Sequence, residues 1–214
     1  MFDRLRSWAA RILRRGQRTA PDRLCEKCGK AAIVFACQVS ERRITKEQQF
    51  CSQCATQSLW MPNPAMARSS PGENGNGREV SVEVEKLICY SGSTHQYIIF
   101  REVQGSRQLT MLTGYFEATA LWWFLKGEPN PRPPTHDAWL NTAIALGATL
   151  VSACVHDRQG DAYFADIRLD QGGSTVKVDV RPSDALLLTL RAGVPFYFTE
   201  KLLAQYAVSE PEPV

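Results

Sequence analysis

Two short segments of the chain combine acidic, basic, hydroxyl and proline side chains at places where helices are expected to begin. Residues 131–137 read PRPPTHD, and residues 178–185 read VDVRPSDA. Free backbone N–H groups and the helix dipole favour anions at a helix start. Since phosphodiester hydrolysis needs proton transfer and charge neutralisation in one place, the two segments predict a site that handles phosphate.

The residue types in and near these segments indicate how such a site would work. Carboxylates that hold one or two divalent ions can activate water and neutralise charge on phosphate, and Mg²⁺ and Mn²⁺ prefer such oxygen ligands. His136 is suited to act as a general acid or base, and arginine can clamp a phosphate. The candidate catalytic residues are Glu117, His136, Asp137, Asp179 and Asp184, and the candidate substrate-binding residues are Arg132, Arg181 and Ser183.

The same segments also have a purely structural interpretation. Thr135 suits the N-cap of a helix, and acidic residues in a first turn compensate the helix dipole. Asp179 and Arg181 would then form an ordinary surface ion pair, and Arg132 would only shape a loop. Covalent catalysis by Ser183 is poorly supported because it lacks a Gly-x-Ser-x-Gly sequence. The residues alone leave the catalytic and the structural interpretation open.

Four of the seven cysteines form two C-x-x-C pairs with 22 residues between them. Two such turns can present four thiolates to a tetrahedral ion, so the spacing predicts a structural zinc site made by Cys25, Cys28, Cys51 and Cys54. Unligated thiols or a redox pair are the alternatives, which are disfavoured because so short a segment buries little core without a metal. The pattern resembles the cysteine module of the activators of bacterial protein-arginine kinases. The other three cysteines are expected in the core: Cys37, Cys89 and Cys154.

Hydrophobic periodicity and the positions of Gly and Pro predict the elements that must position these groups. Expected strands lie near residues 80–84, 97–102, 108–112, 149–157, 161–169, 174–180 and 195–198, and expected helices over 114–126, 135–146, 182–193 and 200–206. Strands come in runs rather than alternating singly with helices. We therefore expect an α+β fold with a largely antiparallel sheet and three to four helices, plus a small zinc-stabilised N-terminal module.

Charge divides the chain into a basic front and a mildly acidic rear. Residues 1–79 carry 14 Lys and Arg against 7 Asp and Glu, and residues 80–205 carry 11 against 13. A basic front suits nucleic acid, an acidic membrane surface or an acidic partner, without choosing between them. The expected parts are a basic amphipathic helix (1–20), the four-cysteine zinc module (21–59), a flexible linker (60–79), the main domain (80–206) and a disordered tail (207–214).

Five strings follow one another in the main domain: VEKL (84–87), FREVQG (100–105), GYFEA (114–118), PRPPTHD (131–137) and VDVRPSDA (178–185). Together they resemble the bifunctional nuclease family over about residues 80–205, a family reported to act on DNA and RNA. The resemblance implies nuclease activity, and the chain keeps the family's polar motif positions: Glu117, His136, Asp137, Asp179, Arg181 and Asp184. Departures from the family pattern at 112–116 and 122–124 change apolar and aromatic residues, which affects substrate shape and assembly more than chemistry.

Five aromatic residues recur at helical spacing within and after the string at 114–118. Exposed rings of this kind can stack the bases of single-stranded nucleic acid. Because aromatic area is normally buried, a place in the core or in a dimer interface is favoured for the set. Its members are Tyr115, Phe116, Trp122, Trp123 and Trp139.

These observations favour a nuclease that hydrolyses phosphodiester bonds in DNA, RNA or both, assisted by Mg²⁺ or Mn²⁺. Nucleic acid is the expected partner, and a protein bound through the zinc module and a homo-oligomer are further expectations. The alternative is a non-catalytic adaptor that recruits protein or nucleic acid through the zinc module and the basic helix, and the acidic balance of the main domain favours it. No apolar run approaches a bilayer span and no secretory signal is evident, so we expect the cytoplasm.

Overall fold

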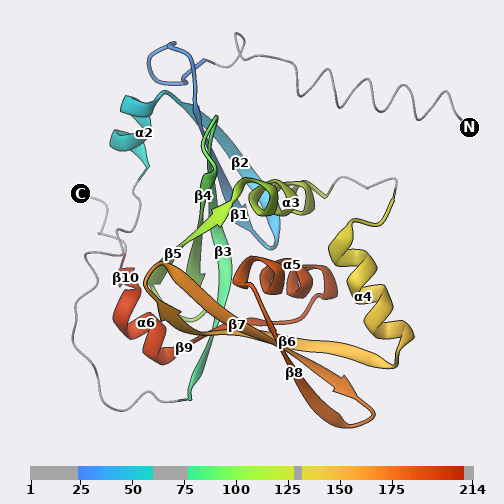
Figure 1. The fold of residues 1–214 in the computed structure, drawn as a ribbon. Helices are drawn as coiled ribbons and strands as arrows, with labels where there is room; N and C mark the ends of the chain where they lie inside the picture. Colours follow the sequence, from blue (N-terminus) through green and yellow to red (C-terminus); the bar gives the residue numbers. More distant parts are fainter. Residues whose placement is uncertain (1–23, 60–76, 128–131, 210–214) are drawn as a thin grey trace, which may run out of the picture.

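The computed structural model describes residues 24–59, 77–127 and 132–209 (Figure 1). The expected basic helix at 1–20, most of the expected linker and the end of the expected tail lie outside these residues. The elements in chain order are β1 (Val34–Ser40), β2 (Arg43–Phe50), α2 (Ser52–Ser58), β3 (Glu79–Tyr90), β4 (His95–Glu102), β5 (Arg107–Gly114), α3 (Tyr115–Lys126), α4 (Thr135–Ala145), β6 (Ala148–Gln159), β7 (Ala162–Gln171), β8 (Ser174–Val180), α5 (Pro182–Ala192), β9 (Phe196–Thr199), α6 (Glu200–Tyr206) and β10 (Val208–Ser209).

The strands join one sheet in the order β10-β5-β4-β3-β9-β6-β7-β8, and β1 pairs with both β2 and β3. Paired strands are antiparallel, apart from β6 and β9, which run parallel. The α+β fold with a largely antiparallel sheet is therefore confirmed, with α3 to α6 in the main domain. Within the described residues, no helix is long and apolar enough to cross a bilayer.

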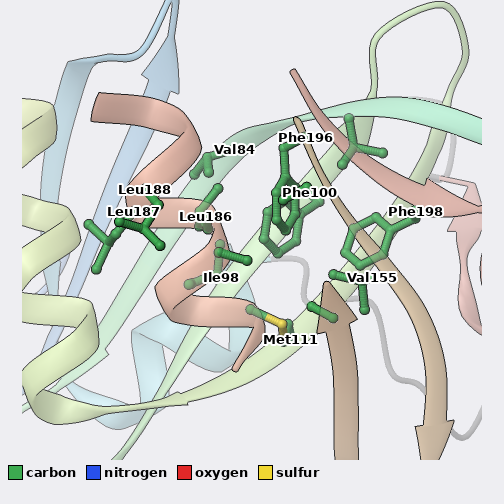
Figure 2. Packing of buried hydrophobic residues seen from close by; sticks show 14 of the residues in the cluster. Val84, Ile98, Phe100, Met111, Val155, Leu186, Leu187, Leu188, Phe196 and Phe198 are labelled. Carbon is green, nitrogen blue, oxygen red and sulfur yellow. The ribbon is translucent and has the colours of Figure 1, made fainter. Parts of the chain in front are cut away.

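The main core lies between the sheet and the buried faces of α3 and α5. Figure 2 shows Leu186, Leu187 and Leu188 of α5 beside Phe100 of β4 and Phe196 of β9. Each leucine is at most 4% exposed, and full burial of such a side chain stabilises the fold by about 1.5–3 kcal/mol. This packing fixes α5, and with it the polar residues of its first turn.

The cysteine module, residues 24–59, is continuous with the main sheet. Its strand β1 pairs with β3 over the register Val34↔Tyr90 to Gln38↔Lys86. A second buried cluster joins residues of the module to residues of β3 and β4: Cys25, Val34, Ala36, Phe50, Cys51, Ala55, Ile88 and Ile99. The module therefore shares both hydrogen bonds and apolar core with the domain that follows it.

Strand β2 of the module also holds the end of α3. Glu47 accepts a hydrogen bond from Trp122 Nε1 at 3.1 Å and pairs with Lys126 Nζ at 2.7 Å. α3 ends at Gly127, which has a left-handed φ of 65°. A Cβ at that position would collide with the guanidinium of Arg43. Contacts from the cysteine module thus fix the C-terminal end of the helix that carries Glu117 in its first turn.

Arg107 ties β5 to β4 and α6. Its Nε and Nη2 each donate to Glu102 at 2.9 Å, and its Nη1 donates to Glu200 at 2.6 Å. These hydrogen bonds hold the pKa values of both carboxyl groups below their usual range. A lowered pKa contributes stability above the unfolded-state pKa of about 4.3, and that stability is lost as the pH falls through the folded-state values.

Replacement of Arg107 by methionine is expected to lower the free energy of unfolding by about 2 kcal/mol at pH 7, because two partly buried carboxylates lose their cation. The loss should shrink as the pH falls through the lowered folded-state pKa values of Glu102 and Glu200, below which both carboxyl groups are protonated in the wild type as well. Urea unfolding of the wild type and the variant, at pH 7 and at the lower pH, measures the loss in free energy of unfolding. Lys46→Met changes an exposed cation of β2 and should have little effect. An equal loss at both pH values would contradict the electrostatic explanation.

Candidate active site at three helix starts

Three helices begin close together, each with a polar side chain in its first turn. Glu117 is the third residue of α3, His136 the second of α4 and Asp184 the third of α5. None of these starts has a side-chain cap. The N-cap residues are Gly114, Pro134 and Arg181.

The expectation that Thr135 caps α4 is wrong. Pro134 takes the N-cap position with extended backbone, φ −67° and ψ 168°, so Thr135 is already the first helical residue. Ser183 is likewise the second residue of α5, after Pro182, whose fixed φ suits a first helical position. The free N–H groups of these helix starts are therefore not satisfied by capping side chains, which leaves them available to an anion.

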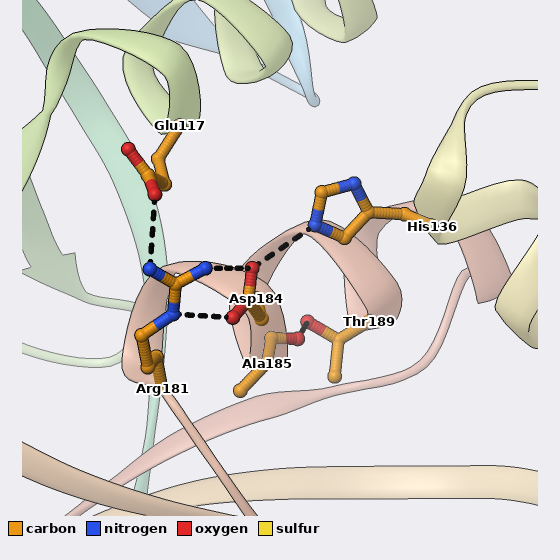
Figure 3. Close-up of polar contacts among 6 residues, drawn as sticks. All are labelled: Glu117, His136, Arg181, Asp184, Ala185 and Thr189. Carbon is orange, nitrogen blue, oxygen red and sulfur yellow. Dashed lines mark hydrogen bonds and ion pairs between the residues drawn. The ribbon is translucent and has the colours of Figure 1, made fainter.

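Arg181 lies at the centre of the polar contacts (Figure 3). Its Nε donates to Asp184 Oδ2 at 2.8 Å, and its Nη1 donates to Glu117 Oε1 at 3.2 Å. His136 Nε2 lies 3.2 Å from Asp184 Oδ1. A carboxylate can only accept, so Nε2 is the donor in this pair. We call Glu117, His136, Arg181 and Asp184 the helix-start cluster.

The cluster presents its cation outward. The Arg181 side chain is 70% exposed, whereas its partners Glu117 and Asp184 are 20% and 26% exposed. The hydrogen bond to Asp184 raises the pKa of Arg181 further above its usual range, so the guanidinium stays charged. An exposed, permanently charged guanidinium over half-buried carboxylates can contact a phosphate without leaving its own helix start.

Apolar packing positions two of the three helices. α3 buries Ala118, Leu121 and Leu125, and α5 buries the run 185–189. α4 has no fully buried residue, although Trp139 packs partly against the core. Its first turn is therefore placed largely by the polar contacts that it makes with α5.

Gly114 allows Glu117 to reach its place. A Cβ at Gly114 would collide with the Glu117 carboxylate, which folds back over the start of α3. Any other residue at position 114 would require the Glu117 carboxylate to shift. The requirement follows from the close approach of the two residues and not from an unusual backbone conformation.

Asp137 and Arg132 lie at a groove outside the helix-start cluster. Asp137 accepts from Nη1 of Arg191, whose side chain is 9% exposed and whose guanidinium lies 5.5 Å from the centroid of the Phe124 ring. Both Asp137 and the exposed Arg132 line a groove of about 690 Å³ between α4, α5 and β6. The neighbouring residues His136 and Asp137 of α4 thus contact different residues of α5: His136 contacts Asp184, and Asp137 contacts Arg191.

Asp179 and Ser183 do not join the helix-start cluster. Val178 and Val180 pack against the main core, so the alternation of β8 turns Asp179 to the opposite face of the sheet, where it pairs in register with Asp166. Ser183 is half-buried and makes no hydrogen bond to the cluster within the described residues. The structure therefore brings together Glu117, His136, Arg181 and Asp184 but not the whole candidate set.

The cluster as arranged does not offer a ready site for Mg²⁺ or Mn²⁺. Throughout the described parts of the chain, only four cysteines bring three or more ligand atoms within 4.8 Å of one another. The guanidinium of Arg181 occupies the position between the carboxylates of Glu117 and Asp184. The divalent ion expected from the sequence stays a prediction.

The four cysteines do converge. The Sγ atoms of Cys25, Cys28, Cys51 and Cys54 all lie within 4.8 Å of one another. The Cys28 and Cys51 sulfurs are 3.6 Å apart, close to the roughly 3.8 Å that tetrahedral geometry with 2.3 Å bonds requires. The Cys54 N–H donates to Cys51 Sγ at 3.5 Å and lowers the pKa of that thiol, which favours the thiolate that binds metals. The cluster therefore has the ligands and spacing of a metal site. As expected, Cys37 lies in the main core, Cys89 packs against it, and Cys154 is buried in β6.

The sequence did not indicate two features of this region. Arg191 has no motif around it and occurs in the last turn of α5, where a basic residue is common for dipole reasons. Tyr115 and Phe116 do not lie in the core, since their exposed fractions are 54% and 81%. Trp122, Trp123 and Trp139 are half-buried. Of the two expected places, the core is therefore wrong for Tyr115 and Phe116, whereas the dimer interface stays a prediction.

Comparisons with known proteins agree with this arrangement. The model of the bifunctional nuclease domain matches residues 98–211, which include every member of the helix-start cluster. The chain is 34% identical over 138 residues to two uncharacterized proteins of Mycobacterium tuberculosis, MT1877 of strain CDC 1551 / Oshkosh and Rv1829 of strain ATCC 25618 / H37Rv. These alignments cover 64% of this chain and 79% of each relative. The chain belongs to the bifunctional nuclease domain family.

Proposed function

We propose that this protein hydrolyses phosphodiester bonds of nucleic acid at the helix-start cluster. The observation that carries the proposal is the contact of Glu117, His136, Arg181 and Asp184 at three helix starts without side-chain caps. Proton-transferring and phosphate-binding groups thus occupy one place in a member of a nuclease family. Asp137, Asp179, Arg132 and Ser183 remain candidates, without a contact to this cluster in support.

His136 is proposed to transfer the proton. Because Nε2 donates to Asp184, the neutral imidazole keeps its lone pair on Nδ1, which forms no hydrogen bond among the described residues. Nδ1 would take a proton from water while the water oxygen attacks phosphorus. The phosphorus–oxygen ester bond on the opposite side of phosphorus then breaks, the leaving oxygen takes a proton from solvent water, and the imidazolium returns its proton to the resulting hydroxide. Asp184 is a positioning residue, because it orients both the imidazole and Arg181.

Arg181 is proposed to bind the phosphate. Its exposed guanidinium can donate to phosphate oxygens, and the N-terminal N–H groups of α5 add partial positive charge beside it. Charge that builds on the nonbridging oxygens during attack would be stabilised by these fixed donors. Glu117 helps to keep the guanidinium in place, and Gly114 leaves room for Glu117.

We further propose that the cysteine cluster holds zinc and that the ion supports the fold of the module, since all four thiols are close together and zinc prefers this set. Mg²⁺ or Mn²⁺ dependence, a cytoplasmic location, a protein partner and a homo-oligomer are retained as proposals from the sequence.

Cleavage of single-stranded DNA, duplex DNA and RNA by the full chain tests the proposed function, with Mg²⁺, with Mn²⁺ and with neither ion. Asp184→Asn is expected to lower the cleavage rate by about 10²-fold or more, because the imidazole and Arg181 lose their shared carboxylate. Asp161→Asn, at a side chain that is 96% exposed, serves as the control and should match the wild type. Absence of cleavage, or equal cleavage by Asp184→Asn, would favour the non-catalytic adaptor.

A further inference from the structure

Two neighbouring aromatic rings are exposed at the start of α3. Phe116 is 81% exposed, the largest exposed fraction of any large hydrophobic residue in the described parts of the chain, and Tyr115 is 54% exposed. Their ring centroids are 5.8 Å apart, with an angle of 78° between the ring planes. Exposing this much aromatic area has no stabilising effect on the fold, so the pair calls for an explanation outside the core.

The pair directly adjoins the helix-start cluster. Tyr115 and Phe116 are the first two residues of α3, and Glu117, which accepts from Arg181, is the third. The rise of about 1.5 Å per residue keeps all three within the first turn of the helix. The backbone that carries the two rings therefore adjoins Glu117, which accepts from the proposed phosphate-binding residue Arg181.

We infer that Tyr115 and Phe116 form a stacking platform for unpaired bases, so that the substrate of the helix-start cluster is single-stranded nucleic acid. This inference rests on the proposed function. Any base has a π-face, so such a platform accepts different sequences, whereas bases inside a duplex are already stacked and paired. The same first turn of α3 carries Glu117, which is paired with Arg181, and this charge disfavours a protein interface, because the cores of such interfaces are depleted of charge.

An abasic strand separates stacking from phosphate binding. Fluorescence anisotropy of the full-length His136→Ala protein, in which cleavage is suppressed, would compare a labelled single strand, the same strand with abasic sugars, and the duplex. The single strand is expected to bind about tenfold more tightly than the abasic strand, as one base stacked on an aromatic ring would give. The duplex should bind no better than the abasic strand.

Variants at Phe116 test the platform itself. Phe116→Ala, in the same background, should weaken single-strand binding about tenfold and leave abasic binding unchanged, whereas Phe116→Trp should preserve both. Phe164→Ala is the matched control, because Phe164 is 36% exposed but lies on β7 between core-facing residues, on the opposite face of the sheet. It should change neither affinity.

Three results would overturn the inference. They are equal binding of the single and abasic strands, unchanged single-strand binding by Phe116→Ala, or a changed oligomeric state of Phe116→Ala without a change in affinity. The last would assign the rings to contact between copies of the chain. Cleavage by the wild-type protein is measured separately. Cleavage without base-dependent binding would contradict the stacking platform alone. Base-dependent binding without cleavage would contradict the proposed hydrolysis and support the platform.

Discussion

Replacement of His136 by alanine is expected to lower the rate of phosphodiester cleavage by about 10²- to 10⁴-fold, the usual contribution of a positioned acid or base. The fold should tolerate the change, since the His136 side chain is partly exposed and α4 contributes no fully buried residue. Initial cleavage rates and thermal unfolding of the two proteins provide the measurement. Added imidazole should restore part of the rate in the variant, because it can enter the space left by the side chain.

Thr135→Ala is the appropriate control for this variant. Thr135 is the exposed first residue of the same helix and has no capping role, so its loss should leave the rate unchanged. A His136→Ala protein that cleaves at the wild-type rate would remove proton transfer from this residue. A slow variant that imidazole does not rescue, and that unfolds at a much lower temperature, would indicate a structural role instead.

Replacement of Cys51 by serine is expected to abolish stoichiometric zinc binding and to unfold the cysteine module. Metal binding contributes on the order of 10 kcal/mol to the folding of small zinc modules, and one of four thiolates is lost. Cys51 is also the N-cap of α2, and its Sγ accepts a hydrogen bond from the Cys54 N–H. The substitution therefore also weakens the start of this helix. Zinc content by atomic absorption and amide hydrogen exchange across β1 and β2 would measure both effects.

Cys89→Ala controls for the loss of a thiol, because Cys89 lies in β3 outside the four-cysteine cluster and should leave the zinc content unchanged. Full zinc content in Cys51→Ser would contradict the proposed ligand set. Unchanged hydrogen exchange in a zinc-free protein would show that apolar packing against β3 is sufficient for the module.

Periodicity predicted the elements of the main domain because most of them have a strong local pattern. The apolar string ALLLTL at 185–190 lies in the expected helix between Pro182 and Gly193, and α5 buries the first five residues of the string. Asp179, a candidate catalytic residue, faces away from the core because Val178 and Val180 pack against it. The family strings contain the residues that meet at the helix starts together with others that do not, and they could not assign the contacts. Successive residues of a helix point about 100° apart, so His136 and Asp137 were bound to differ in partner, and only the packing of α4 on α5 decides which partner each has.

The pairing of strands that lie far apart in the chain could not be predicted from the sequence. Nothing local to residues 34–40 indicates that β1 adds to β3, since 38 residues separate Ser40 from Glu79 and no motif marks the register. Exposure of Tyr115 and Phe116 was equally hidden, because aromatic residues at helical spacing usually face a core. The sequence therefore predicted the helices and strands of the main domain better than it predicted their long-range pairing and the surroundings of their side chains.

The pairing of β1 with β3 has a consequence for how this chain can be divided. A fragment that begins at β3 would contain the whole region matched by the family model, yet it would lose the strand that covers one edge of β3. Ile88 and Ile99, now fully buried, would face water beside a row of unpaired backbone N–H and C=O groups. Such an edge recruits strands from other molecules, so the excised fragment would tend to self-associate. In this protein, strand β1 of the N-terminal module therefore protects the edge of β3 in the family domain.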